Sequence, residues 1–284
     1  MLPLEPRLTD AQRRAFASDG YCVVRDALPR TAVDRVTEDL VAVVVAQLAA
    51  SGVPHLNGHE SLATRLERLI TVSPVRYLAA LRRGAKMHGV HRLVGHDAVE
   101  AIARGLGVAL PSLVSEPVLH VIGDRLVVPG GYQGFVAHQD WPSIQGSLDS
   151  IVTWIPLVAV SSGNFPLMVV PGSHRLGPIT GVVRDHVREV PEDVCPSVSF
   201  VPVDAMPGDV VCMSTWTVHK TGVDGSTGFR VACSTRWDNA LEPTFVERGY
   251  PCAYRRSVER DWITPDFPTC EQVLGTIAPA ARDR

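Results

Sequence analysis

The sequence predicts a mainly β protein with flanking helices, built around a double-stranded β-helix (jelly-roll) core. From Pro117 onward, short runs rich in β-branched and aromatic residues alternate with Gly, Pro, Asp and Ser turns, as expected for a two-sheet roll. Before that point, apolar residues recur at helical spacing. We therefore predict a single domain over residues 1–284, with an N-terminal helical buttress over about 1–115, a jelly-roll core over about 116–240 and a C-terminal extension over 241–284.

The first element should be a helix, because Thr9 and Gln12 have the spacing of a capping box and Gly20 supplies a stop. A short strand over 21–25 follows. A long helix is predicted over 31–50, since its apolar residues form one stripe. The stripe consists of Val33, Val36, Leu40, Val43, Val44 and Leu48. Shorter helices are predicted over 61–70, 74–83 and 98–105, and we expect the helices to buttress the outside of a sheet.

The core strands are expected in the second half of the chain. Residues 149–157 indicate a buried strand, 166–174 a strand followed by a turn, and 206–213 a turn that leads into another apolar strand. A further strand is predicted over 229–236. The charged stretch 177–196 should be exposed and is the candidate for a lid.

A candidate metal site begins at His138-Gln139-Asp140. In an extended strand, residues two apart point to the same face, so His138 and Asp140 could bind one ion while Gln139 points away. His219 would complete a 2-His-1-carboxylate set if its strand lies beside that of His138. Such a set leaves the opposite coordination positions open, as in oxygen-activating iron sites. Taken singly, each histidine could equally be a hydrogen-bonding group of the core or surface.

Several separate motifs accompany this triad. They are Trp-Ile-Pro-Leu at 154–157, Val-Val-Pro-Gly-Ser-His at 169–174, Pro-Gly-Asp-Val-Val at 207–211, and Gly-Phe-Arg at 228–230, whose Arg lies eleven residues after His219 (230 − 219 = 11). With them, the stretch 138–236 resembles the phytanoyl-CoA dioxygenase family of iron(II)- and 2-oxoglutarate-dependent oxygenases. Residues 8–25 are similar to the opening helix and strand of that family. One departure is Asn164-Phe165-Pro166, where the family usually has Gly after the Asn.

Arg230 is the candidate anchor for the keto acid, since a guanidinium can hold its distal carboxylate with two parallel hydrogen bonds. The resemblance further implies that Thr221 adds a hydroxyl hydrogen bond and that Gln139 and Trp154 line the co-substrate pocket. Arg236 should share the face of Arg230 on a regular strand, which makes it the rival anchor or a substrate contact. The alternative for Arg230 is a surface salt bridge, which its apolar neighbours disfavour.

The resemblance implies an Fe(II)/2-oxoglutarate-dependent dioxygenase that consumes O2 and releases succinate and CO2. Hydroxylation of an unactivated C–H bond is the default outcome. Related halogenases lack the carboxylate ligand, so Asp140 disfavours chlorination, whereas desaturation, epoxidation and ring closure stay open because substrate placement decides among them. We expect a small metabolite or a natural-product intermediate of secondary metabolism as the substrate. Its candidate contacts are Gln133, Trp141, Arg236 and Trp237, each of which could equally belong to the core.

Two other functions are compatible with parts of the sequence. One is a cupin-type jelly-roll isomerase or hydrolase that uses the same ligands without a keto acid, although Arg230 at its spacing disfavours this. The other is a catalytically inactive binding protein of the same fold, which the intact ligand set disfavours.

Composition limits the partners. The net charge is −3 and no block of basic residues stands out, so neither nucleic acid nor an anionic membrane is indicated, and a small-molecule partner is favoured. We find no signal-like start and no apolar stretch long enough to span a bilayer, and we expect a soluble, cytoplasmic protein.

Two other groups of potential ligands carry weaker signals. Six cysteines lack any CxxC spacing, which argues against zinc sites. His88, His91 and His96 form a second histidine cluster, which we interpret as a loop, with metal binding or substrate gating as alternatives.

Overall fold

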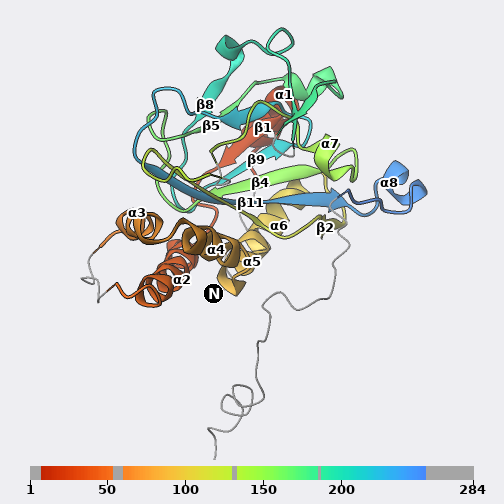
Figure 1. The fold of residues 1–284 in the computed structure, drawn as a ribbon. Coiled ribbons are helices and arrows are strands. Elements are labelled where there is room, and N and C mark those ends of the chain that lie inside the picture. Colours follow the sequence, from red (N-terminus) through yellow and green to blue (C-terminus); the bar gives the residue numbers. More distant parts are fainter. Residues whose placement is uncertain (1–7, 54–59, 130–132, 185–186, 254–284) are drawn as a thin grey trace, which may run out of the picture. The chain divides into compact units, whose positions relative to one another are not determined.

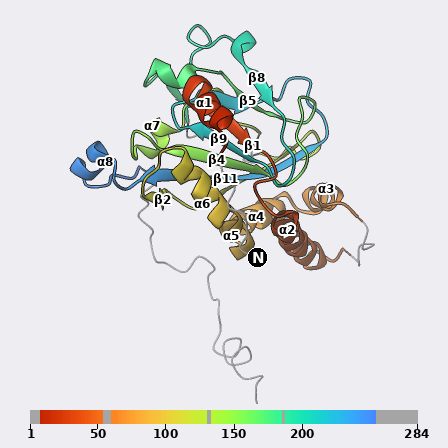
Figure 2. The same ribbon diagram turned by 180° about the vertical axis from the view of Figure 1, so that it is seen from behind.

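The structure, a computed structural model, describes residues 8–53, 60–129, 133–184 and 187–253. The part of the predicted C-terminal extension from 254 onward therefore lies outside the described residues. Figures 1 and 2 show one large sheet with a layer of helices on one side and a smaller sheet on the other. The predicted arrangement of a two-sheet roll with flanking helices is thus confirmed.

The large sheet has six antiparallel strands. Their order is β1 (Tyr21–Val24), β9 (Val210–Ser214), β4 (Ile151–Pro156), β11 (Phe229–Asn239) and β2 (Pro111–Leu113), with β3 (Val118–Gly123) also paired to β11. The long strand β11 is therefore central, with β4 on one side and both β2 and β3 on the other. A strand held on both sides is a rigid platform for the side chains that it carries.

The smaller sheet lies on the opposite side of the roll from the helices of residues 30–105 (Figure 1). It contains β10 (His219–Thr221), β5 (Leu167–Val169) and β8 (Val201–Val203) in that order, and a hairpin of β6 (Val182–Arg184) and β7 (Val187–Glu189) lies nearby. His138 connects the two parts, because it forms isolated antiparallel bridges to both His219 and Glu189. The predicted lid segment 177–196 thus contains a hairpin whose Val182 is 75% exposed.

Alternation along β11 divides its side chains between two environments. Val231, Cys233 and Trp237 belong to the apolar cluster that includes the helices. Ala232 packs instead into the cluster between the two sheets, with Trp154 of β4 among its members. Residues with even numbers on β11 consequently face the interior of the roll.

The N-terminal helices begin and end largely where their local signals predict. Helix α1 (Asp10–Asp19) starts at a complete capping box of Thr9 and Gln12 and ends at Gly20, whose φ of 80° suits glycine. Helix α2 (Arg30–Ala49) buries five residues of its predicted stripe. The remaining predicted helices are α3 (Leu62–Val72), α4 (Pro74–Ala85) and α6 (Asp97–Gly105).

The second histidine cluster is not a loop, so that prediction was wrong. His88 begins helix α5 (His88–Val94), which forms because Val90, Leu93 and Val94 recur at helical spacing and are buried. His96 caps α6, since its Nδ1 accepts a hydrogen bond of 3.1 Å from the backbone of Ala98. The described elements also include two short α-helices, α7 (Trp141–Ile144) and α8 (Pro243–Glu247), and two 3₁₀ helices, η1 (Ser173–Leu176) and η2 (Ser197–Ser199).

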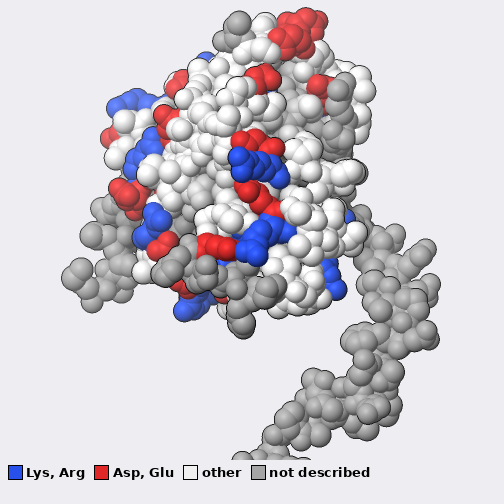
Figure 3. All heavy atoms as spheres, turned by 60° about the vertical axis from the view of Figure 1, so that its left-hand side comes forward, with Lys and Arg blue, Asp and Glu red and all other residues white. Residues whose placement is uncertain are grey.

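None of the described helices combines the length and the apolar character needed to cross a membrane. On the face in Figure 3, acidic and basic side chains are interspersed.

Candidate metal centre

His138, Asp140 and His219 meet in the interior of the roll. All three are buried, and one ligand atom from each lies within 4.8 Å of the others. Nε2 of His138 is 3.7 Å from Oδ1 of Asp140, and Nε2 of His219 is 3.7 Å from Oδ2. Within the described ranges, no other group of three potential ligands has this geometry.

The two histidines are held by the backbone of the smaller sheet. The N–H of His138 donates to the carbonyl of His219, and the N–H of His219 donates back, both at 3.0 Å. The predicted strand does not continue through Asp140, however. Asp140 is helical (φ −75°, ψ −35°), and its N–H and that of Trp141 both donate to the carbonyl of Thr215, at 2.9 and 3.1 Å. A turn into α7, rather than strand alternation, therefore brings the carboxylate to the histidines.

Backbone carbonyls fix the orientation of both imidazoles. Nδ1 of His138 donates to the carbonyl of Val136 at 2.7 Å, and Nδ1 of His219 donates to the carbonyl of Thr217 at 2.9 Å. Because a carbonyl can only accept, the hydrogen of each neutral ring is on Nδ1. The lone pair of each Nε2 is thus directed toward Asp140, as a metal ligand requires.

The electrostatics of the site favour the protonation states that bind a cation. Burial lowers the pKa of His138 to about 3 and also lowers the pKa of His219. Burial would raise the pKa of Asp140, but Arg236 and the two histidines hold it well below its ordinary value. At neutral pH the site therefore consists of two neutral imidazoles and one carboxylate.

One buried oxygen is left for a cation. Oδ2 of Asp140 has no hydrogen-bond partner, whereas Oδ1 accepts a hydrogen bond of 2.9 Å from Nη2 of Arg236. An unpaired buried carboxylate oxygen is costly unless it binds a cation. Two imidazole nitrogens and one carboxylate oxygen suit a divalent transition metal such as iron(II), so the residues fit the metal that the sequence predicts.

A narrow chamber lies beside the three ligands, between the two sheets. Arg230 lies in it and is only 1% exposed, so it is a buried residue rather than a surface one. Its guanidinium carbon is 5.7 Å from the ring centroid of Trp154. Besides the two histidine ligands, the polar walls include His120, Lys220, Thr221, Arg230, Ser234 and Arg236, and the apolar walls include Phe135, Val152, Trp154, Leu167 and Met213.

The departure at Phe165 has a structural consequence. Phe165 adopts a left-handed backbone conformation with a φ of 56°, which glycine adopts more easily. In this conformation its carbonyl accepts a hydrogen bond of 2.6 Å from Nη1 of Arg230. The turn therefore retains the backbone shape that glycine would give, and it supports the guanidinium.

Two further predicted co-substrate residues have different surroundings. Thr221 lines the chamber, and its Oγ1 accepts a hydrogen bond of 3.2 Å from the N–H of Phe135. Gln139 does not line the chamber, contrary to expectation. Its amide group donates to the carbonyls of Gly177 and Trp216, both at 2.8 Å, and accepts from the N–H of Ile179 at 2.9 Å. Gln139 thus ties the start of the lid segment to the turn before β10.

Two of the predicted substrate contacts do not line the chamber. Trp237 faces the helices because of the alternation along β11, and its Nε1 donates to Oγ1 of Thr153 at 3.0 Å. Trp141 stacks on Trp216 with ring centroids 4.7 Å apart. Arg236 does line the chamber, but there it contacts a metal ligand.

Sequence reasoning missed His120, which lies on β3 opposite Ala232. Its Nε2 is 2.9 Å from Oγ of Ser234. Burial, with Arg230 and Arg236 nearby, holds the pKa of His120 well below its ordinary value, so the ring is neutral. Alternation along β11 could have identified Ser234, but placing His120 requires the register between β3 and β11.

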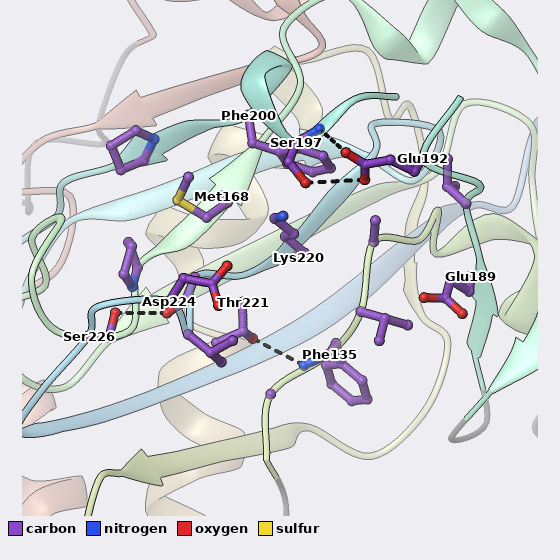
Figure 4. A pocket seen from close by; sticks show the side chains of 18 of the residues that line it. Phe135, Met168, Glu189, Glu192, Ser197, Phe200, Lys220, Thr221, Asp224 and Ser226 are labelled. Carbon is purple, nitrogen blue, oxygen red and sulfur yellow. Dashed lines mark hydrogen bonds between the residues drawn. The ribbon is translucent and has the colours of Figure 1, made fainter. Parts of the chain in front are cut away.

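A cleft of about 670 Å³ adjoins the chamber (Figure 4). Gln133 lines it, together with Lys220 and Thr221 of β10. Along this strand the side chain of Lys220 points to the opposite face from those of His219 and Thr221. The ammonium of Lys220 lies 4.4 Å from the ring centroid of Phe200. Phe135, Lys220 and Thr221 line both spaces, so the cleft reaches the edge of the chamber.

The two-sheet roll and the 2-His-1-carboxylate set define the class: a jelly-roll protein with a centre for one divalent metal ion. The family model of phytanoyl-CoA dioxygenase (PhyH) matches residues 16–232, and the chain belongs to this family.

Similar proteins are consistent with that membership. A 1-deoxypentalenic acid 11-beta-hydroxylase from Streptomyces exfoliatus is 30% identical over 126 residues, a match that spans 40% of this chain and 42% of the relative. This chain thus matches less than half of the relative's length.

Solved structures share the fold. The non-heme alpha ketoglutarate dependent carbocyclase SnoK from nogalamycin biosynthesis is 19% identical with a TM-score of 0.54, over 89% of this chain and 94% of that one. EctD from S. alaskensis, solved with 2-oxoglutarate and 5-hydroxyectoine, is 18% identical with a TM-score of 0.54, over 91% and 88%. The predicted jelly-roll fold is therefore confirmed.

Proposed function

We propose that this protein is an iron(II)- and 2-oxoglutarate-dependent dioxygenase that hydroxylates an unactivated C–H bond of a small molecule, with release of succinate and CO2. The observation that carries the proposal is the buried Oδ2 of Asp140, which has no hydrogen-bond partner and lies near two imidazoles whose Nδ1 atoms are hydrogen-bonded to backbone carbonyls. His138, Asp140 and His219 would hold the iron. When bound, iron would couple O2 reduction to oxidative decarboxylation of 2-oxoglutarate, which supplies the oxidant for the C–H bond.

Arg230 would anchor the distal carboxylate of 2-oxoglutarate. It is buried in the chamber, and its planar guanidinium can form two parallel hydrogen bonds to a carboxylate. The carbonyl of Phe165 accepts a hydrogen bond from one end of the guanidinium, and the ring of Trp154 lies beside the guanidinium in the chamber wall. Thr221 lines the same chamber and would add a hydroxyl hydrogen bond.

The chamber walls would also protect the reaction from water. The ring of Phe135 lies 5.4 Å from that of His138 and 6.0 Å from that of His120, so it covers the ligand side of the chamber. Val152 and Met213 are buried on the opposite sheet. A dry site of this kind strengthens the interactions that orient the co-substrate and prevents wasteful side reactions.

The substrate is proposed to be a small metabolite or natural-product intermediate that approaches through the adjoining cleft. The cleft is large enough for such a molecule, with a volume of about 670 Å³, and it combines apolar walls with polar groups such as Gln133 and Lys220. The hydroxylase relative is named for 1-deoxypentalenic acid, and SnoK is named for nogalamycin biosynthesis, which supports a role in secondary metabolism. Asp140 occupies the position that a chloride ligand would need, which disfavours halogenation.

Succinate release tests the proposal. The full chain is loaded anaerobically with iron(II) and 2-oxoglutarate and then exposed to O2, with Asp140→Ala as the matched control. We expect succinate from the wild-type protein, at a low rate that a true substrate raises, and none from the variant. Iron binding without succinate would favour a cupin-type enzyme, and absence of iron binding would favour an inactive binding protein.

A further inference from the structure

Arg236 and Asp140 form a buried ion pair at the metal centre. Nη2 of Arg236 donates to Oδ1 of Asp140 at 2.9 Å, and the two residues are 6% and 2% exposed. The same carboxylate leaves Oδ2 without a hydrogen-bond partner. The guanidinium of Arg236 therefore hydrogen-bonds one oxygen of this candidate metal ligand, Oδ1, and leaves Oδ2 available to a metal ion.

The guanidinium is itself held in place. Nη1 of Arg236 donates to Oγ of Ser234 at 3.1 Å, and that hydroxyl is 2.9 Å from Nε2 of His120. Arg236 and Ser234 are two residues apart on β11 and so share its inner face. His120 belongs to β3, which pairs with β11. A chain of contacts thus runs from a rigid strand pair to the carboxylate.

We propose that Arg236 is a positioning residue that restricts Asp140 to binding the metal through Oδ2 alone, and that Ser234 and His120 hold Arg236 in the required orientation. A carboxylate that chelates through both oxygens would occupy an additional coordination position. Restriction to one oxygen keeps that position open for co-substrate and O2. This inference rests on the proposed function for the iron(II), the co-substrate and O2.

The same geometry separates Arg236 from its rival role as the keto-acid anchor. Arg230 and Arg236 both face the chamber from β11, but Arg230 donates to a carbonyl, whereas Arg236 donates to a carboxylate. A guanidinium already paired with an anion attracts a second carboxylate less strongly. Arg236 is thus better suited to support Asp140 than to anchor the keto acid.

The test compares two arginines on one strand. Arg236→Gln and the matched control Arg230→Gln are prepared as full chains, and iron(II) affinity is measured anaerobically by competition with a coloured chelator. We expect Arg236→Gln to weaken iron(II) binding by about 10- to 100-fold, the usual effect of losing a group that orients a metal ligand. Arg230→Gln should stay within roughly twofold of wild type in iron(II) affinity, because Arg230 donates to the carbonyl of Phe165 and packs beside Trp154, neither of which is a candidate metal ligand.

Cobalt(II) in place of iron(II) gives a readout that a general loss of stability would not move. Its visible absorption depends on coordination number, so Arg236→Gln should alter the spectrum, whereas Arg230→Gln should leave it unchanged. Arg236→Lys keeps the charge but loses the planar fork, and Ser234→Ala keeps the guanidinium but loosens it. Both variants should show the same spectral change in weaker form. If Arg236→Gln does not fold, these two variants test the positioning role of Arg236.

The proposal is overturned if the folded variants at 236 and 234 bind iron(II) like the wild type and give its cobalt(II) spectrum. It is also overturned if Arg236→Gln raises only the KM for 2-oxoglutarate, which would make Arg236 the anchor. These metal-binding results are independent of succinate release. A wild-type protein that binds iron(II) without producing succinate would refute the proposed function. The comparison of metal binding among the variants could still be made.

Discussion

His138 and His219 exchange two backbone hydrogen bonds of 3.0 Å each, although they belong to segments far apart in the chain. Both residues are therefore paired in an antiparallel β-bridge as well as being candidate ligands of one ion. Directly opposed residues of an antiparallel pair project their side chains to the same face. The spacing of the two imidazoles is thus set by the sheet itself and does not depend on flexible loops.

Removal of a ligand should abolish metal binding. His138→Ala lacks the imidazole but still forms the backbone hydrogen bonds to His219, whereas Asp140→Ala also leaves the buried guanidinium of Arg236 without its carboxylate partner. We expect both variants to lose bound iron(II) and all succinate production, with circular dichroism like that of the wild type for His138→Ala and a lower stability for Asp140→Ala. Retention of one equivalent of iron by either variant, measured after gel filtration, would contradict the ligand assignment.

Arg230→Ala should chiefly weaken binding of the co-substrate. The variant loses up to two charge-assisted hydrogen bonds to the distal carboxylate, each worth about 1.5–3 kcal/mol. We expect the KM for 2-oxoglutarate to rise by at least about 10-fold, with iron(II) affinity unchanged, as measured by succinate release over a range of co-substrate concentrations. An unchanged KM for 2-oxoglutarate in this variant, together with a raised KM in Arg236→Ala, would show that Arg236 and not Arg230 anchors the co-substrate.

Local signals explain why so much of the site could be predicted. The ligand tripeptide, the distal histidine and the arginine eleven residues later are visible as spacing along the chain, and the alternation on β11 put Arg230 and Arg236 on one face. What failed depended on tertiary contacts. The carbonyl of Thr215 turns the chain at Asp140, and no sequence pattern indicates that acceptor. His120 reaches Ser234 only through the register of β3 on β11.

Acid should destabilise the metal-free protein. Burial lowers the pKa of His120, His138 and His219 below the ordinary value of 6.5. Below pH 6.5 the unfolded chain therefore binds protons that the folded chain does not, and stability falls as the pH falls. The lowered pKa of Asp140 acts in the same direction, because stability present above its ordinary pKa is lost as pH falls through its folded value.

Thermal unfolding of the metal-free protein between pH 8 and pH 5 checks this prediction. We expect the Tm to be nearly constant above about pH 7 and to fall progressively below it. His120→Asn offers a control, since it removes one of the three histidines. It should reduce the number of protons taken up on unfolding, and with it the pH dependence of the unfolding free energy, by up to about one proton. A Tm that stays level down to pH 5 would show that these histidines take up protons in the folded state.

Gln139→Leu should separate a structural role from a co-substrate role. The side chain of Gln139 is 1% exposed, and its three hydrogen bonds to Gly177, Ile179 and Trp216 join the lid segment to the turn before β10. Leucine has similar volume but leaves these backbone groups unpaired. Because each unsatisfied buried group costs about 1–3 kcal/mol, we expect the free energy of unfolding to fall by at least about 2 kcal/mol in urea denaturation.

The kinetic consequence of Gln139→Leu distinguishes it from a change at the co-substrate. The variant keeps Arg230 and Thr221, which line the chamber, so the KM for 2-oxoglutarate should remain within about twofold of wild type. Thr221→Val serves as the matched comparison, because it removes a hydroxyl that does line the chamber and should raise that KM. If Gln139→Leu raised the KM as much as Thr221→Val while its stability stayed unchanged, the side chain would have to reach the co-substrate after all.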